Sequence, residues 1–221
     1  MNRALILANG KSPSKRLFQN ILVSADLFIC ADGGANTAAR FGCAPDLIIG
    51  DLDSIKKATI TVFSNVIVKK LKDQNSTDLE KALTAAIRKK SKEIVVLGAT
   101  GGRLDHAIGN LSALAKFTGK VPITFIDDTG KFMAVHHSRK LCLPAGTIVS
   151  LLPLSRCSGI VTQGLKWNLK NESLELGVRE STSNVIVSLP MSVKVKKGNL
   201  IIFVGTNNEN PLLKNLISIS Q

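Results

Sequence analysis

The stretch DLIIGDLDSI, Asp46–Ile55, joins an apolar run to two carboxylates that stand two residues apart. The run Leu47–Ile49 is typical of a strand buried on both faces of a parallel sheet. Asp51 and Asp53 follow it directly, and their side chains share one side if the extended geometry continues. Because open α/β sheets bind ligands beyond the carboxyl ends of their strands, this stretch predicts both a buried strand and a site at its end.

Further short apolar runs in the first half resemble Leu47–Ile49, and helical patterns separate them. They are ALILA (Ala4–Ala8), DLFICA (Asp26–Ala31), VIV (Val66–Val68), EIVVLG (Glu93–Gly98) and ITFID (Ile123–Asp127). The clearest helical pattern is STDLEKALTAAIRKK, in which Ser76 is a candidate N-cap and Leu79 and Leu83 share one face. Strands that alternate with helices predict a three-layer α/β/α domain with a mainly parallel, Rossmann-like sheet.

The pattern changes near DDTGK, Asp127–Lys131. Beyond it the chain contains short strand patterns and turns without a long helix, and SVKVKKG (Ser192–Gly198) alternates apolar and polar residues as a half-exposed strand does. This half predicts an all-β sandwich. We therefore expect an α/β domain over residues 1–129 and a β-sandwich domain over residues 130–221.

The composition describes a globular and strongly basic chain, with 44% hydrophobic residues and a formal net charge of +13. Such a charge attracts anions, which include nucleotide phosphates, nucleic acid and acidic membranes. The chain has no Tyr and one Trp, which is little for a protein that stacks single-stranded bases. No segment is long enough to span a membrane, and we expect a cytoplasmic protein with reduced cysteines, of which Cys30 and Cys142 lie in apolar, core-like runs.

Carboxylates follow several of the predicted strands, at the edge that we call the acidic rim. The segments are DGGAN (Asp32–Asn36), GDLDS (Gly50–Ser54), DQNSTD (Asp73–Asp78) and ATGGRLDH (Ala99–His106). Crowded carboxylates repel one another unless a cation neutralises them, and Mg²⁺ is commonly held by one or two carboxylates together with substrate phosphates. The acidic rim therefore predicts a Mg²⁺ site, with glycine loops and basic residues available for phosphates.

Each segment of the rim also has a simpler interpretation. DGGAN alone is compatible with a tight turn, GDLDS with a helix N-cap, and Asp78 with the N-terminal dipole of its helix. The segment NGKS, Asn9–Ser12, ends like a phosphate-binding P-loop but lacks its first glycine. No G-x-G-x-x-G follows the first strand, which argues against a dinucleotide oxidoreductase.

The ordered set of motifs resembles the thiamine pyrophosphokinase family. The motifs are DGGAN, PDLIIGDLDSI, DQNSTDLEKAL, GATGGRLDHAIGNL, GLKWNLKN and STSN, and they extend from Asp32 to Asn184. The resemblance implies an enzyme that moves a diphosphoryl group from ATP to the hydroxyl of thiamine, giving AMP and thiamine diphosphate. It also implies a requirement for Mg²⁺, a catalytic α/β domain, a thiamine-binding β-sandwich, and a homodimer with active sites at the interface.

The resemblance assigns roles residue by residue. It implies that Asp51, Asp53 and Asp78 hold the metal and that Asp32 is an active-site aspartate. It places a larger set on the ATP and phosphate side, namely Asn36, Gln74, Thr77, Gly101, Gly102, Arg103 and Asp105. It places Trp167, Ser181, Ser183 and Asn184 on the thiamine side. An aromatic face suits the thiamine cation. A core or interface aromatic is the less favoured alternative for Trp167, whereas Ser183 and Asn184 are equally compatible with a turn before the next strand.

Two rival functions remain at this stage. A related diphosphokinase that acts on a pterin alcohol would share the acidic rim but would differ in the pocket for the second substrate. A basic nucleic-acid-binding protein would use clusters such as KKLK and RKKSK, which are more typical of solvated faces. We expect no membrane partner and no specific nucleic acid, because the ordered motifs favour ATP and thiamine as substrates.

Overall fold

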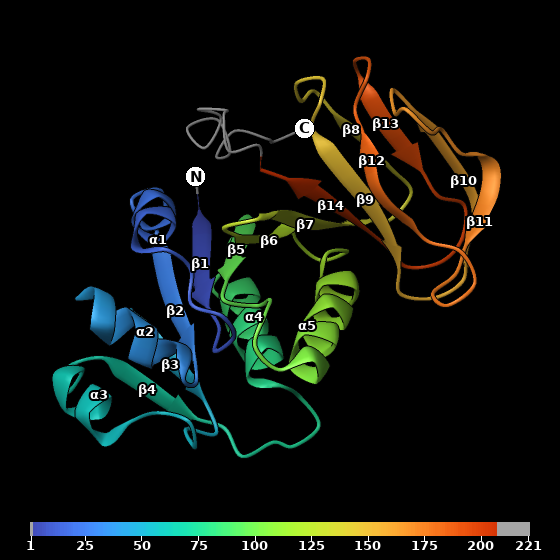
Figure 1. The fold of residues 1–221 in the computed structure, drawn as a ribbon. Helices are drawn as coiled ribbons and strands as arrows, with labels where there is room; N and C mark the ends of the chain where they lie inside the picture. The colour runs from blue at the N-terminus through green and yellow to red at the C-terminus, as the bar shows by residue number, and fades with distance from the viewer. Residues whose placement is uncertain (1, 207–221) are drawn as a thin grey trace. The chain divides into compact units, whose positions relative to one another are not determined.

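The computed structural model describes residues 2–206 of the chain. The contacts divide the chain into two compact units, Met1–Asp128 and Thr129–Gln221. Each unit has its own sheet architecture, and Figure 1 traces both along the chain. Among the described residues, no helix is both long enough and apolar enough to span a lipid bilayer.

The first unit is built on a parallel sheet with the strand order β6-β5-β1-β2-β3-β4. Its strands are β1 (Arg3–Leu7), β2 (Leu27–Ala31), β3 (Leu47–Gly50), β4 (Ile67–Lys70), β5 (Glu93–Leu97) and β6 (Ile123–Asp127). The chain winds outward from β1 to β4 and then returns to β5 on the other side of β1. All carboxyl ends therefore lie at one edge, which is the acidic rim predicted from the sequence.

Helices connect the strands of this unit and cover the sheet as a three-layer α/β/α arrangement (Figure 1). They are α1 (Lys15–Leu22), α2 (Gly34–Phe41), α3 (Lys57–Val62), α4 (Asp78–Arg88) and α5 (Leu104–Phe117). Helix α4 packs on β2 and β3 through Leu79, Ala82, Leu83 and Ala86, all of which are buried. The predicted fold class of this half is thereby confirmed.

Two local predictions in this unit need correction. The N-cap of α4 is Thr77 rather than Ser76: Thr77 forms a capping box with Glu80, whereas the Ser76 hydroxyl donates to Asp73 Oδ2 at 2.6 Å. The reason is that the capping box requires a Glu three residues after the cap, and Thr77 has that spacing. Strand β4 covers Ile67–Lys70 and so overlaps the predicted run Val66–Val68 only in part. All its residues are exposed, and it forms the edge of the sheet.

The second unit is a two-layer antiparallel β-sandwich, as predicted. One sheet has the order β12-β9-β14-β7 and the other β11-β10-β13-β8. The strands are β7 (Gly130–Val135), β8 (Ser138–Leu141), β9 (Ile148–Pro153), β10 (Cys157–Gln163), β11 (Lys170–Leu174), β12 (Ser181–Val185), β13 (Met191–Lys194) and β14 (Leu200–Gly205). Alternate residues of both sheets, among them Leu151, Ile160, Val193 and Ile202, form one buried core.

Three features of the second unit differ from the sequence-based expectation. Strand β11 was not predicted, because KNESL carries little apolar pattern. The alternative that Ser183 and Asn184 form a turn is wrong, since both lie in β12, where the pairing with β9 shifts register between Ser181 and Asn184. All four cysteines are free, but Cys142, expected in a core-like run, is exposed, and Cys157, the first residue of β10, is the buried one in this half.

Candidate active site

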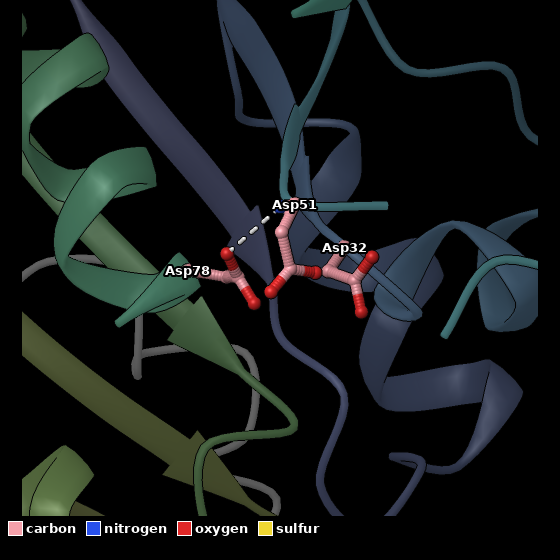
Figure 2. A group of neighbouring side chains, drawn as sticks. All are labelled: Asp32, Asp51 and Asp78. Atoms are coloured by element: carbon pink, nitrogen blue, oxygen red, sulfur yellow. Dashed lines mark hydrogen bonds between the residues drawn. The ribbon is translucent and has the colours of Figure 1, made fainter. Parts of the chain in front are cut away.

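The structure gathers three carboxylates at the acidic rim, and we call Asp32, Asp51 and Asp78 the aspartate cluster. One oxygen from each lies within 4.8 Å of one from each of the others. Figure 2 shows the carboxylate of Asp51 between those of Asp32 and Asp78. The three residues are up to 46 positions apart in the chain and come from the ends of β2 and β3 and from the start of α4.

Backbone hydrogen bonds fix where these carboxylates lie. The N–H of Asp32 donates to Ile49 O of the neighbouring strand at 2.9 Å, which ties the end of β2 to β3. The N–H of Asp51 donates to Asp78 Oδ1 at 3.2 Å, which ties the end of β3 to the first turn of α4. The cluster is therefore built into the junction of two strands and one helix, and does not depend on a free loop.

A glycine leaves room for the cluster to form. A Cβ atom at Gly50 would lie 2.9 Å from Asp32 Cβ and 3.1 Å from Asp78 Oδ1. Any side chain at this position would consequently push Asp32 and Asp78 apart. The glycine in DLIIGD is thus a requirement of the site, in addition to ending the strand.

Asp32 is a buried carboxyl group close to other negative charges. The residue is 3% exposed, and among the described residues its Oδ1 has no hydrogen-bond partner. Burial raises the pKa of Asp32, and the charges of Asp78 and Asp53 raise it further, while hydrogen bonds from Gly33 and Ser54 oppose the change. A buried carboxylate that has one oxygen without a donor and that lies beside two other carboxylates fits a divalent cation with oxygen ligands.

Asp53, which the resemblance places in the metal set, lies outside the aspartate cluster. Its side chain is exposed, its N–H donates to Asp51 Oδ1 at 3.2 Å, and its Oδ1 accepts from the Ser54 hydroxyl at 2.8 Å. Its charge nevertheless reaches Asp32, as the raised pKa of that residue indicates. Asp53 is thus at the open side of the cluster, and its role as a ligand stays a prediction.

Asn36 has a bracing role in this structure. Its Nδ2 donates to Ser54 O at 2.9 Å, and its Oδ1 accepts from the Lys56 N–H at 3.0 Å and the Thr59 hydroxyl at 2.8 Å. These bonds hold the segment after β3 against the start of α2. The structure thus places Asn36 beside the loop of Asp51 and Asp53, with its own amide already occupied.

The segment before α4 is a compact turn. Asp73 accepts hydrogen bonds from the Asn75 N–H at 2.9 Å and from the Ser76 hydroxyl at 2.6 Å. Gln74 sits in this turn with an exposed side chain, and the Thr77 hydroxyl caps α4 by accepting from the Glu80 N–H at 3.2 Å. The turn thus leaves Gln74 exposed to solvent four residues before Asp78.

A glycine loop follows β5, and we use this name for Gly98–Arg103. Its backbone is joined to the loop after β1, because the N–H groups of Gly10 and Lys11 donate to Gly98 O at 2.7 Å and to Thr100 O at 3.0 Å. Gly101 and Gly102 have φ values of 71° and 73°, which few other residues adopt. Asn110 of α5 supports the loop through a 2.8 Å hydrogen bond to Ala99 O.

Two predicted phosphate-side residues pair with each other. Arg103 Nη2 lies 2.6 Å from Asp105 Oδ2, and both side chains are largely exposed. The hydrogen bond from Arg103 lowers the pKa of Asp105 to about 2.

Lys11 lies near the glycine loop and had no role assigned from the sequence. It belongs to the segment NGKS, which resembles the end of a P-loop but lacks its first glycine. It is exposed, and its side chain would collide with any Cβ at Gly101.

The second unit contains a surface pocket of about 270 Å³, which we call the tryptophan pocket. Its lining residues are Trp167, Asn168, Leu169, Arg179, Glu180, Ser181, Thr182 and Asn184. The structure thus brings Trp167, Ser181 and Asn184 into one pocket lining. Ser183 is not in the lining: its φ is 55°, and its N–H donates to the Ser150 hydroxyl at 3.0 Å.

Asn184 holds the tryptophan segment in place. The residue is 3% exposed; its Oδ1 accepts from the Trp167 N–H at 3.2 Å, and its Nδ2 donates to Trp167 O at 2.7 Å. Trp167 is 58% exposed, and Lys166 Nζ lies 4.7 Å from the centroid of its ring. Trp167 is therefore not a core aromatic in the part of the chain that the structure describes, because most of the residue is open to solvent.

Glu180 is a pocket residue that sequence reasoning missed. It brings a carboxylate to the pocket that contains Trp167, and its Oε1 accepts from the Gly177 N–H at 2.6 Å. The other charge in the lining, Arg179, is paired with Glu172 at 2.6 Å. An available hint was that Glu180 directly precedes STSN in the sequence. An aromatic face with a carboxylate beside it is suited to an organic cation.

Family models match both units. The model for the thiamin pyrophosphokinase catalytic domain matches residues 18–125, and the model for the thiamin pyrophosphokinase vitamin B1 binding domain matches residues 136–200. Thiamine pyrophosphokinase 1 from Oryza sativa subsp. japonica is 34% identical over 212 residues, which cover 83% of this chain and 80% of that protein.

Solved structures of related proteins have the same fold. The crystal structure of thiamine pyrophosphokinase from Bacillus subtilis has a TM-score of 0.78 at 25% identity and covers 93% of this chain and 100% of its own. That of yeast thiamin pyrophosphokinase has a TM-score of 0.80 at 20% identity, covers 99% and 89%, and supports the fold alone. The matched models and the 34% identical relative together show that this chain belongs to the thiamin pyrophosphokinase family.

Proposed function

We propose that the protein transfers the terminal diphosphoryl group of ATP to the hydroxyl of thiamine, producing AMP and thiamine diphosphate. The observation that carries this proposal is the aspartate cluster, whose buried and unpaired Asp32 oxygen fits a cation at the rim of a family-typical sheet. In the reaction the thiamine hydroxyl oxygen bonds to the β-phosphorus, the bond from that phosphorus to the AMP oxygen breaks, and the hydroxyl proton passes to a carboxylate of the rim.

We propose Asp51, Asp53 and Asp78 as the ligands of Mg²⁺, with Asp53 approaching from its exposed loop. Asp32 lies beside these ligands as an active-site carboxylate. The proximity of Asp32, Asp51 and Asp78 supports this assignment, because hard oxygen ligands suit Mg²⁺. When bound, Mg²⁺ would neutralise charge on the phosphate oxygens. The carboxylates themselves orient the bound groups, because the backbone hydrogen bonds at Asp32 and Asp51 keep them from rearranging.

For the nucleotide we propose the loops that surround the cluster on the rim. Gln74 is free to contact ATP, while Thr77 and Asn36 hold the loops in shape through their own hydrogen bonds. The glycine loop gives backbone N–H groups at Gly101 and Gly102 for phosphate oxygens. Arg103 would bind phosphate as a bidentate donor, and Asp105 keeps its guanidinium oriented meanwhile.

For thiamine we propose the tryptophan pocket. The exposed face of Trp167 and the carboxylate of Glu180 complement a cationic ring. Ser181 and Asn184 lie in the same lining, whereas Ser183 acts through the backbone of β12. Ser183 thereby sets the register that directs Ser181 and Asn184 toward the pocket.

We further propose a cytoplasmic homodimer in which one subunit's aspartate cluster works with its partner's tryptophan pocket. Mixing two impaired variants at a thiamine concentration well below KM tests this arrangement, since Asp51→Asn disables the first site and Trp167→Ala weakens the second. Refolding them together should restore part of the activity, because mixed dimers contain one intact pair of sites. Activity no higher than the sum of the separate variants would contradict the shared site.

The decisive experiment is product analysis with purified protein, ATP, Mg²⁺ and thiamine. We expect AMP and thiamine diphosphate in equal amounts, and no product when EDTA is present. AMP formed only with a pterin alcohol would retain the diphosphotransferase and reject thiamine. If neither alcohol gives AMP, the proposal fails, and duplex binding that weakens steeply with salt would then support the nucleic-acid alternative.

A further inference from the structure

A buried lysine stands directly behind the aspartate cluster. Lys81 is the fourth residue of α4, and its side chain is 5% exposed, although lysines are almost never buried without a partner. Its Nζ lies 3.0 Å from Asp78 Oδ1. Lys81 lies in the motif DQNSTDLEKAL, but the roles expected from the sequence do not include it.

The two oxygens of Asp78 have different surroundings. Oδ1 accepts from both Lys81 Nζ, at 3.0 Å, and the Asp51 N–H, at 3.2 Å. These two donors occupy Oδ1, so that Oδ2 is the oxygen left for a ligand at the cluster (Figure 2). Lys81 therefore contacts the cluster from the protein side without taking the position of an incoming cation.

The charges of the cluster need such a neighbour. Three carboxylate oxygens within 4.8 Å of one another repel strongly where Asp32 is shielded from water. An ammonium at 3.0 Å from one of them offsets part of this repulsion. A divalent cation bound by the same carboxylates would offset the same repulsion and would also be repelled by the ammonium.

We propose that Lys81 is a positioning residue that acts as a built-in counter-ion, holding the cluster together before a divalent cation binds and opposing that cation when it does. The inference rests on the proposed Mg²⁺ site. It has a consequence that a packing role would not have: the metal-free protein depends on Lys81 more than the metal-bound protein does.

Two substitutions separate charge from orientation. Lys81→Gln keeps a donor for Asp78 Oδ1 and removes the charge, whereas Lys81→Met removes both. The matched control is Lys116→Met. Lys116 of α5 pairs at 2.9 Å with Glu80, which lies in α4 as Lys81 does, but Lys116 is 62% exposed and its partner is outside the cluster. Thermal unfolding in EDTA and in Mg²⁺, and Mn²⁺ binding by electron paramagnetic resonance, are measured for each protein.

We expect both Lys81 variants to unfold at a lower temperature than the wild type in EDTA and to gain more from Mg²⁺ than the wild type gains. The dissociation constant for Mn²⁺ should fall by about tenfold in Lys81→Gln, close to the low end of measured couplings between close charges. Lys116→Met should match the wild type in its response to metal. A folded Lys81→Gln protein is sufficient for the test if Lys81→Met does not fold.

Other outcomes would overturn the inference in different ways. Equal metal-induced shifts in the wild type and Lys81→Gln would reduce Lys81 to a packing and hydrogen-bonding role. Weaker Mn²⁺ binding in the variants would mean that Lys81 serves the metal by orienting Asp78. If the wild type binds neither Mg²⁺ nor Mn²⁺, both the proposed metal site and this inference fail. If the wild type binds the ions and the Lys81 variants bind them with the same affinity, only this inference fails.

Discussion

The aspartate cluster and the tryptophan pocket are built in opposite ways. The cluster lies where strand ends and a helix start converge, and Asp32, its least exposed member, is 3% exposed. The pocket lies on a sheet surface with Trp167 58% exposed, and a buried Asn184 holds only its backbone. The difference agrees with the functions that we propose for them, because binding of metal and phosphates needs fixed charges, whereas binding of an organic cation needs an open aromatic face. The comparison indicates that the chain holds its side chains most rigidly at the aspartate cluster, where several negative charges lie close together.

The largest expected effect concerns the cluster. Asp51→Asn and Asp53→Asn should each lower turnover by about a hundredfold or more, above the 10- to 100-fold losses typical of residues that support metal ligands. Only Asp51→Asn should raise the unfolding temperature in EDTA, because it removes a crowded charge. AMP formation and thermal unfolding are the measurements.

The matched control for these variants is Asp26→Asn. Asp26 accepts from the Arg3 N–H at 2.9 Å at the opposite end of the sheet, and its loss should leave turnover within a few-fold of the wild type. Near-normal turnover of Asp53→Asn would remove Asp53 from the metal set and leave the cluster as the structure shows it.

The next effect compares two asparagine braces. Asn184→Ala removes two hydrogen bonds to the Trp167 backbone from a buried position, and should lower the free energy of unfolding by about 1 to 3 kcal/mol and raise KM for thiamine. Asn110→Ala removes the bond to Ala99 O and should instead raise KM for ATP. Denaturant unfolding and steady-state kinetics are the measurements. If both variants changed the KM of the same substrate, the assignment of thiamine to one region and ATP to the other would be contradicted.

Trp167→Ala tests the open face of the pocket. Loss of the aromatic ring should raise KM for thiamine by roughly 2- to 30-fold, which corresponds to about 0.5 to 2 kcal/mol for a cation on an aromatic ring. Stability should change little because the ring is mostly exposed, and Trp167→Phe should recover most of the affinity. A large loss of stability with unchanged KM would instead assign Trp167 a structural role.

The smallest expected effect is that of Glu180→Gln. An exposed carboxylate near a cation contributes about 0.2 to 1 kcal/mol, so KM for thiamine should rise at most about fivefold and should respond to salt. KM for ATP should stay constant. The same rise in Glu175→Gln, a nearby carboxylate outside the pocket lining, would show a general charge effect rather than a contact at the pocket.

Much of the architecture follows from local pattern. Runs such as Ile94–Leu97 and Leu47–Ile49 are apolar enough to be buried on both faces, and this alone predicts a parallel sheet with its carboxyl ends at one edge. Strand β11 escaped prediction because its stability comes from pairing with β10 and not from its own pattern. The N-cap of α4 was misplaced by one residue, although the spacing from Thr77 to Glu80 was readable.

The sequence by itself determined the alternation of strands and helices, the acidic rim and the family, because each depends on residues close together or in fixed order. Only the tertiary structure decided that Asp32 meets Asp51 and Asp78, and that Lys81 is buried behind them. The same holds for Asn184, which contacts Trp167 across 17 positions of the chain from β12, where the pairing with β9 shifts register. The physical reason is that convergence depends on strand order and on the space left at Gly50, which no local pattern encodes.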